Sequence, residues 1–199
     1  MQIFLETARL ILRRFTEADG DHLFALDNDP DVMRFLNGGT PTPRDVIQND
    51  ILPGLLHYDE DAPGYGAWAA IEKTNRDFLG WFSFRLSDDS SGEVILGYRL
   101  HKAAWGKGYA TEGSRALIRK GFTELGVQRV VATTYEENIG SRRVMEKVGM
   151  KLMRTFRITV DDLVHSGSFH STSLEVWDGA DVEYALERAD WERQEMLGG

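Results

Sequence analysis

VILGYRLHKAAWGKGYATEGSRALIRKGFTELG, residues 94–126, is the stretch of the sequence from which the fold follows. It begins with the apolar run 94–100, continues through a loop that contains Gly106 and Gly108, and ends as a helical pattern at Gly126. This order predicts a strand, a glycine-containing loop and a helix in direct succession. It brings free backbone N–H groups and a helix N-terminus to one point, which is typical of a site for a pyrophosphate.

The two loop glycines are compatible with more than one role. They allow the backbone to approach a phosphate closely, but they could equally serve only a tight turn between strand and helix. A Walker loop is excluded, because His101 stands where its first glycine is required and Gly108 replaces its Ser or Thr. A dinucleotide-binding fingerprint is weakened, because Thr111 stands in place of its third glycine.

Four separate motifs resemble one known family. The octapeptide WGKGYATE at residues 105–112 resembles the coenzyme A pyrophosphate loop of the GNAT superfamily of acyl-CoA N-acyltransferases. It is most similar to the branch of ribosomal-protein-alanine N-acetyltransferases, the Rim type. Further motifs of this branch are ETARLILR at 6–13, NIGS with EKVGM at 138–150, and DVEYAL followed by Trp191 at 181–191. The resemblance spans residues 4 to 191.

The expected fold is α/β, or α+β in stricter usage. The resemblance implies a mixed, mostly antiparallel sheet of six or seven strands with helices on both faces, in a single N-acetyltransferase domain over 1–199. The residue pattern predicts strands at 9–15, 67–72, 78–86, 93–100, 129–135, 151–160 and 182–187. It predicts the main helices at 109–125 and 139–147, and a long loop at 161–179.

The strand at 93–100 alternates between two faces. Glu93, Ile95, Gly97 and Arg99 share one face, and Val94, Leu96, Tyr98 and Leu100 share the other. In the resembled family this strand diverges from the next one, and the acyl thioester lies between them. The resemblance therefore implies that backbone N–H groups here hold the pantetheine arm and polarise the thioester carbonyl.

The resemblance also carries over the residues that would bind acetyl-CoA and assist the reaction. Asn138 would orient the pantetheine arm. Many family members have a Tyr four residues beyond the Ser141 position, but here that residue is Met145, so Ser141 would assist the departing thiolate. The expected cofactor-binding residues are Tyr98, Arg99, Leu100, Trp105, Gly106, Lys107, Gly108, Tyr109, Ala110, Thr111, Asn138 and Ser141.

The general base is less clearly marked. Rim-type relatives often carry Glu at the position of Ile95, so the candidate here is Glu93, which shares its face; a solvated residue at a strand start is the competing interpretation. An α-amino group with a pKa near 8 is about a tenth neutral at pH 7, whereas a lysine amine is well under a thousandth neutral. The lack of a base therefore slows acetylation least when the acceptor is an N-terminal amine or another amine of low pKa.

Composition excludes several classes of function. The 199 residues suit one domain, and the net charge of −9 argues against non-specific nucleic-acid binding. The chain has no cysteine, which removes disulfides and thiolate catalysis and fits a cytoplasmic location. No apolar run approaches the ~20 residues of a membrane helix, and no signal peptide is visible. We expect no metal site, although His165 and His170 flank a Ser/Gly stretch.

The predicted function is transfer of an acetyl group from acetyl-CoA, as co-substrate, to a primary amine by direct attack. The acceptor is a protein N-terminus or a small-molecule amine, and its identity and the oligomeric state, a homodimer included, stay open. Two alternatives remain. One is a non-catalytic module that senses acyl-CoA, suggested by Met145 and Ile95. The other is a dinucleotide-binding oxidoreductase, against which the predicted antiparallel hairpin at 67–86 argues.

Overall fold

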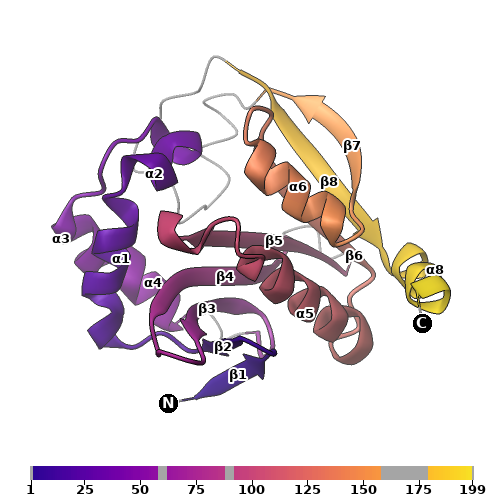
Figure 1. Ribbon diagram of the computed structural model, residues 1–199, viewed down its shortest axis with the longest axis horizontal. Helices are drawn as coiled ribbons and strands as arrows, with labels where there is room; N and C mark the ends of the chain where they lie inside the picture. The colour runs from indigo at the N-terminus through magenta and orange to yellow at the C-terminus, as the bar shows by residue number, and fades with distance from the viewer. Residues whose placement is uncertain (1, 58–61, 88–91, 158–178, 199) are drawn as a thin grey trace.

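One sheet runs through the whole of the structure, a computed structural model that describes residues 2–57, 62–87, 92–157 and 179–198 (Figure 1). Its eight strands lie in the order β1-β2-β3-β4-β5-β6-β8-β7. They are β1 (Ile3–Glu6), β2 (Leu10–Arg13), β3 (Gly66–Glu72), β4 (Phe78–Leu86), β5 (Glu93–Leu100), β6 (Arg129–Tyr135), β7 (Lys151–Phe156) and β8 (Asp181–Glu187). Every neighbouring pair is antiparallel except β5 and β6. The mixed, mostly antiparallel sheet is confirmed, and the oxidoreductase alternative, which requires a parallel-sheet domain, is wrong.

The sheet has one strand more than the six or seven expected. The single strand predicted at 9–15 is the second arm of a hairpin, β1–β2. The turn between the arms is closed by Thr7, whose backbone N–H donates to the Leu10 carbonyl at 3.0 Å and whose hydroxyl accepts from the Leu10 N–H at 2.9 Å. At the other end of the chain, β7 stops at Phe156, and the predicted loop at 161–179 lies outside the described residues apart from Gly179.

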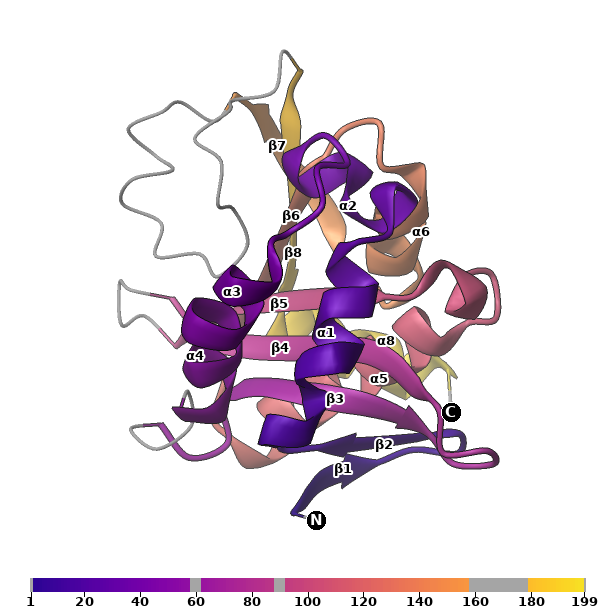
Figure 2. The same cartoon turned by 90° about the vertical axis from the view of Figure 1, so that its left-hand side faces the viewer.

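Helices cover both faces of the sheet, as expected (Figure 2). One face carries α1 (Gly20–Asp27), α2 (Pro30–Asn37), α3 (Arg44–Val46), the π-helical turn η2 (Ile47–Ile51) and α4 (Leu52–His57). The other face carries α5 (Tyr109–Glu124) and α6 (Ile139–Lys147). Short 3₁₀ turns, η1 (Glu17–Asp19) and η3 (Lys102–Ala104), and a C-terminal helix, α8 (Arg188–Gly198), complete the described elements. None of these helices has the length and apolar character needed to cross a membrane.

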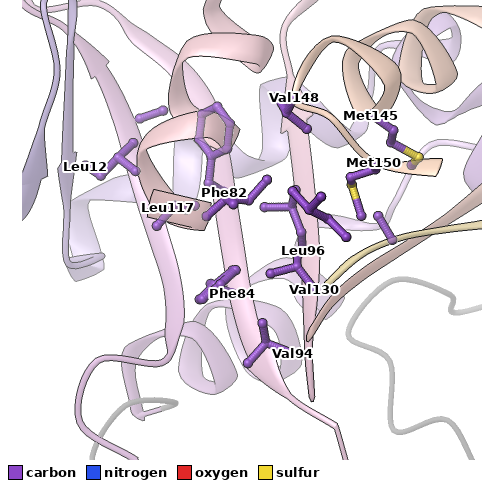
Figure 3. Close-up of a cluster of buried hydrophobic side chains, with 14 of the residues drawn as sticks. Leu12, Phe82, Phe84, Val94, Leu96, Leu117, Val130, Met145, Val148 and Met150 are labelled. Atoms are coloured by element: carbon purple, nitrogen blue, oxygen red, sulfur yellow. The ribbon is translucent and has the colours of Figure 1, made fainter. Parts of the chain in front are cut away.

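The sheet separates two hydrophobic cores because its strands alternate sides. Phe82 and Phe84 of β4 pack with Leu117 of α5 in the first core, which Figure 3 shows, whereas Trp81 belongs to the second core under α1–α4. In β5, Val94, Leu96 and Leu100 are buried in the first core and Tyr98 packs against it, so the predicted alternation is confirmed. Arg99 points to the second face, where its guanidinium lies over the Trp81 ring.

The parallel pair β5–β6 is joined over only a short length. Pairing runs from Glu93↔Arg129 to Ile95↔Val131 and then stops, although β5 continues to Leu100 and β6 to Tyr135. Beyond this point β5 pairs only with β4, and β6 only with β8. In Figure 2, β3–β5 run across the view while β7 and β8 turn upward. We call the unpaired ends, residues 96–100 of β5 and 132–135 of β6, the fork.

Candidate active site

The glycine loop leads directly from the end of β5 into α5. Gly106 and Gly108 have φ angles of 72° and 84°, a left-handed conformation that favours glycine. Gly108 is the N-cap of α5, whose first N–H groups have no intrahelical partner. The loop is tied back to β5, because the Trp105 indole N–H donates to the Leu100 carbonyl at 2.8 Å. The predicted strand, loop and helix are therefore confirmed, with the helix N-terminus at the open end of the fork.

A clamp from the β1–β2 hairpin holds this loop in place. The Arg9 Nη1 donates to the Lys107 carbonyl at 2.9 Å, and its Nε donates to the Glu112 carboxylate at 2.7 Å. The Thr7 hydroxyl also donates to Glu112, at 2.5 Å. Burial alone would raise the pKa of Glu112, but these hydrogen bonds outweigh it and lower the pKa below its usual value. The sequence motif around Arg9 predicted a strand, but gave no sign that Arg9 reaches the loop.

The residues just inside α5 face different ways. Tyr109 is buried, and its hydroxyl donates to the Glu72 carboxylate at 2.6 Å, a hydrogen bond that raises its pKa. Tyr109 therefore offers a ligand at the loop only its backbone. Lys107 is exposed, and Ala110 and Thr111 are half-buried. The loop offers a ligand mainly backbone N–H groups and one lysine side chain.

A chain of hydrogen bonds spans the fork through the N-terminus of α6. From β5, the Tyr98 hydroxyl lies 2.9 Å from the Ser141 Oγ and 3.1 Å from the Ser141 carbonyl oxygen. The Ser141 N–H donates to the Asn138 Oδ1 at 3.2 Å, which caps α6. The Asn138 Nδ2 donates in turn to the Thr134 hydroxyl on β6 at 3.0 Å. The structure thus brings together Tyr98, Ser141 and Asn138, predicted from two separate stretches of the sequence, and adds Thr134.

Met145 has no part in this polar chain. Its side chain is 2% exposed and packs in the first core beside Val148 and Met150 (Figure 3). It is a core residue at the position where the resemblance implies a tyrosine in many family members. Ser141 and Tyr98 are therefore the hydroxyl groups that the described residues place between β5 and α6.

Two predicted residues point away from the fork. Arg99 is 6% exposed, and its guanidinium lies 2.5 Å from the Asp27 carboxylate of α1, on the opposite face of the sheet. Only the Arg99 backbone can face a ligand in the fork. Glu93 stands at the paired end of β5, five residues before Tyr98, and its carboxylate forms an ion pair with Arg129 at 3.0 Å. The structure does not bring Glu93 to the other candidate residues.

A cavity of about 380 Å³ lies on the far side of the glycine loop. It is lined by His22, Phe78 and His101, with Lys107 and Tyr109 on the loop side. Burial lowers the pKa of His101, which favours the neutral form of its imidazole. None of the four residues of the hydrogen-bonded chain lines this cavity, and we assign it no role in the reaction. Within the described ranges no three His, Asp or Glu side chains gather in a way suited to a metal ion, and His165 and His170 lie outside those ranges.

Comparison with known proteins agrees with this geometry. The FsC-acetyl coenzyme A-N(2)-transacetylase of Aspergillus fumigatus is 29% identical over 96% of this chain and 79% of its own length. YdaF of Bacillus subtilis, provisionally named a ribosomal N-acetyltransferase, is 27% identical over 76% of this chain and 75% of its own. The crystal structure of a GNAT-family acetyltransferase from Bacillus anthracis superposes with a TM-score of 0.72 at 24% identity, over 95% of this chain and 99% of the other.

The model of the acetyltransferase (GNAT) domain family matches residues 9–151, most of the chain. The match contains the glycine loop, the fork and the Tyr98–Ser141–Asn138 contacts. The resemblance drawn from the sequence motifs is confirmed, and the chain belongs to the GNAT acetyltransferase family.

Proposed function

We propose that this chain transfers the acetyl group of acetyl-CoA to a primary amine by direct attack of the amine on the thioester. The observation that carries the proposal is the end of β5–β6 pairing at Ile95, with the glycine loop at the end of β5 and a hydroxyl-bearing helix N-terminus across the opening. A fork of this kind leaves backbone N–H groups of β5 available to a ligand. The chain has no cysteine, so the acetyl group passes without an acyl-cysteine intermediate.

Each side of the fork has its own role in the proposal. The loop residues 105–111 bind the pyrophosphate through backbone N–H groups, and the dipole of α5 favours the negative charge. The backbone of Tyr98, Arg99 and Leu100 holds the pantetheine arm and polarises the carbonyl. Asn138 orients the arm, and Ser141 assists the departing thiolate.

The role of Glu93 as general base stays a prediction, and its placement argues against it. Its carboxylate is held in an ion pair with Arg129, at the paired end of β5 and away from Ser141. The Glu93→Gln variant tests the role. If Glu93 is the base, removing its carboxylate must slow acetyl transfer and remove the acidic limb of the pH–rate profile. We expect both to stay unchanged.

Without a strong base, the acceptor is an amine that is partly neutral at working pH. An α-amino group, at a protein N-terminus or in a small molecule, meets this condition better than a lysine side chain. The Aspergillus relative, whose name specifies acetylation at N(2), supports an acceptor of this class.

The test is thiol release from acetyl-CoA against amines and short peptides that differ in pKa. The protein adds no thiol background, because it has no cysteine. We expect release with low-pKa amines and much slower release with lysine-like amines. Binding of acetyl-CoA without release, across the whole panel, would favour the acyl-CoA sensor, and a failure of acetyl-CoA to bind would reject both.

We also propose that residues 1–199 act as one domain, because a single sheet connects β1 with β8. The lack of cysteine supports a cytoplasmic setting. A homodimer stays a prediction, and light scattering of the purified chain measures it directly.

A further inference from the structure

The Tyr98 hydroxyl is a functional group that the proposal above leaves without a role. Tyr98 stands on β5 at the start of the fork, and its ring packs against the first core. Its oxygen reaches the first turn of α6 and lies within hydrogen-bonding distance of both Ser141 oxygens, Oγ at 2.9 Å and the carbonyl at 3.1 Å. These two contacts join the strand to the residue proposed to assist the thiolate.

Counting hydrogens limits how these contacts are made. A tyrosine hydroxyl has one hydrogen, and the Ser141 carbonyl can only accept. If Tyr98 donates to the carbonyl, the contact between the hydroxyls requires Ser141 to donate to Tyr98, and the serine hydrogen is occupied. If Tyr98 donates to the Ser141 Oγ instead, the serine hydrogen is free to point elsewhere. The same heavy-atom geometry therefore holds two hydrogen-bond arrangements, and only the second leaves Ser141 able to donate to a sulfur atom.

We propose that Tyr98 is a positioning residue that donates to the Ser141 Oγ as the thioester breaks, so that the Ser141 hydroxyl donates a hydrogen bond to the departing thiolate of coenzyme A. The inference rests on the proposed acetyl transfer and deepens it. A donor that itself accepts a hydrogen bond is polarised and becomes a stronger donor. Tyr98 thus contributes the support that a lone serine hydroxyl lacks.

The surroundings of Ser141 suit this role. The Ser141 N–H is bound to Asn138, and Asn138 is bound to Thr134, so the backbone that carries the hydroxyl is anchored to β6. Tyr98 approaches from β5, the other side of the fork. Burial raises the pKa of Tyr98 to about 12, so its hydroxyl stays protonated at any pH at which the enzyme works. It is a lasting hydrogen-bond donor and a poor source of a proton.

No proton transfer from Tyr98 is needed for the step to balance. The amine nitrogen forms a bond to the acetyl carbon, and the carbonyl electrons move to oxygen. When they return, the carbon–sulfur bond breaks and its electron pair leaves on sulfur. A thiol with a pKa near 8.5 is a competent thiolate leaving group, and it needs only stabilisation of its charge. The proton that the amine loses goes to water, and both hydroxyl groups keep their own.

The first test is kinetic and uses a matched control. Tyr98→Phe removes one hydroxyl, and we expect single-turnover acetyl transfer to slow about ten-fold, with the acetyl-CoA KM changed less than about two-fold. Tyr65→Phe is the control, because Tyr65 also packs against the first core and its hydroxyl donates to a backbone carbonyl, that of Leu125, at 3.1 Å. Tyr65→Phe should leave the rate unchanged. Because Tyr98 acts through Ser141, adding Tyr98→Phe to Ser141→Ala should slow the reaction no further.

The second test needs no turnover and separates this inference from the proposed function. If the fork stabilises the thiolate, the thiol pKa of coenzyme A is lower in the complex than in solution. The affinity for coenzyme A then rises with pH between these two pKa values, about ten-fold in total for each unit by which binding lowers the pKa. Calorimetry from about pH 6.5 to about pH 9 measures this rise, and desulfo-coenzyme A, which has no sulfur, corrects for every other titrating group. We expect the rise in wild type and Tyr65→Phe, and its loss in Tyr98→Phe and Ser141→Ala.

The outcomes are distinct. A rise that depends on Tyr98, in a protein that acetylates no amine, supports the hydrogen bond from Ser141 to the thiolate but rejects acetyl transfer, and with it the role of that bond as the thioester breaks. A rise that is equal in wild type and Tyr98→Phe, or that is absent in both, overturns the inference even if the enzyme is active. Failure of coenzyme A to bind at all overturns both.

Discussion

The two faces of the sheet are built differently. The face with α5 and α6 has two regular helices, the glycine loop and a core in which glycines let a helix approach closely. The face with α1–α4 has short helices and a π-helical turn, and buried charge pairs connect them to the sheet: Arg99 with Asp27 at 2.5 Å and Arg13 with Asp19 at 2.7 Å. We infer that close packing maintains the core under α5, whereas buried charge pairs anchor α1 and the turn before it to the sheet.

The Arg99–Asp27 pair should give the largest effect of any single change. Both side chains are almost fully buried, so Asp27→Ala removes a carboxylate that pairs with a buried arginine charge. We expect the free energy of unfolding to fall by about 3–5 kcal/mol, measured by urea denaturation. Asp21→Ala in the same helix is the control, because Asp21 pairs with Arg44 at an exposed site and should cost less than about 1 kcal/mol. Equal costs would show that α1 is not anchored through the buried pair.

Glycine-to-alanine changes sharpen the contrast between the faces. At Gly113 of α5 a Cβ would lie 2.3 Å from the Phe82 ring, which is fully buried and cannot move aside. We expect Gly113→Ala to destabilise the fold by about 1–3 kcal/mol in thermal or urea unfolding. At Gly20 of α1 a Cβ would lie 3.5 Å from the nearest Leu52 methyl group, an ordinary contact. Gly20→Ala should be neutral or stabilise by up to about 1 kcal/mol. The reverse order would contradict the close-packed account of the cofactor side.

The smallest predicted effect is at the exposed lysine of the loop. Because the loop binds mainly through its backbone, Lys107→Gln should weaken acetyl-CoA binding at most about five-fold, and less at high salt. Calorimetric titration at two salt concentrations measures both quantities. A loss of a hundred-fold or more would assign the pyrophosphate chiefly to Lys107 and not to the backbone N–H groups.

Local patterns were enough to predict the cofactor side. The apolar run, the glycines and the helical stripe between residues 94 and 126 are contiguous in the chain, so the strand, loop and helix could be assigned from the sequence. The alternation of β5 even placed Tyr98 and Arg99 on opposite faces. What the alternation could not supply was the partner of each: Ser141 lies 43 residues from Tyr98 and Asp27 lies 72 from Arg99.

The misses have two kinds of cause. The hairpin β1–β2 was taken for one strand, because its turn at Thr7 is closed by a local hydroxyl contact with no Gly or Pro to mark it. Helix α8 was not predicted; its Met196 and Leu197 are 81% and 88% exposed, so no apolar stripe marks it. Glu93 was chosen for its face, and the sequence does not show that Arg129 of the neighbouring strand pairs with it. The first two misses come from elements that lack the usual local signals, and the third depends on a tertiary contact.

Amide hydrogen exchange with and without acetyl-CoA tests the central claim most directly, because the claim specifies which backbone N–H groups bind the ligand. We predict new protection at residues 105–111, at the fork end of β5 and at the start of α6 around Ser141. The paired end of β5 near Glu93 and the cavity wall at His22 and His101 should stay unchanged. Protection at that cavity, with none at the loop or the fork, would place the ligand elsewhere and contradict the account.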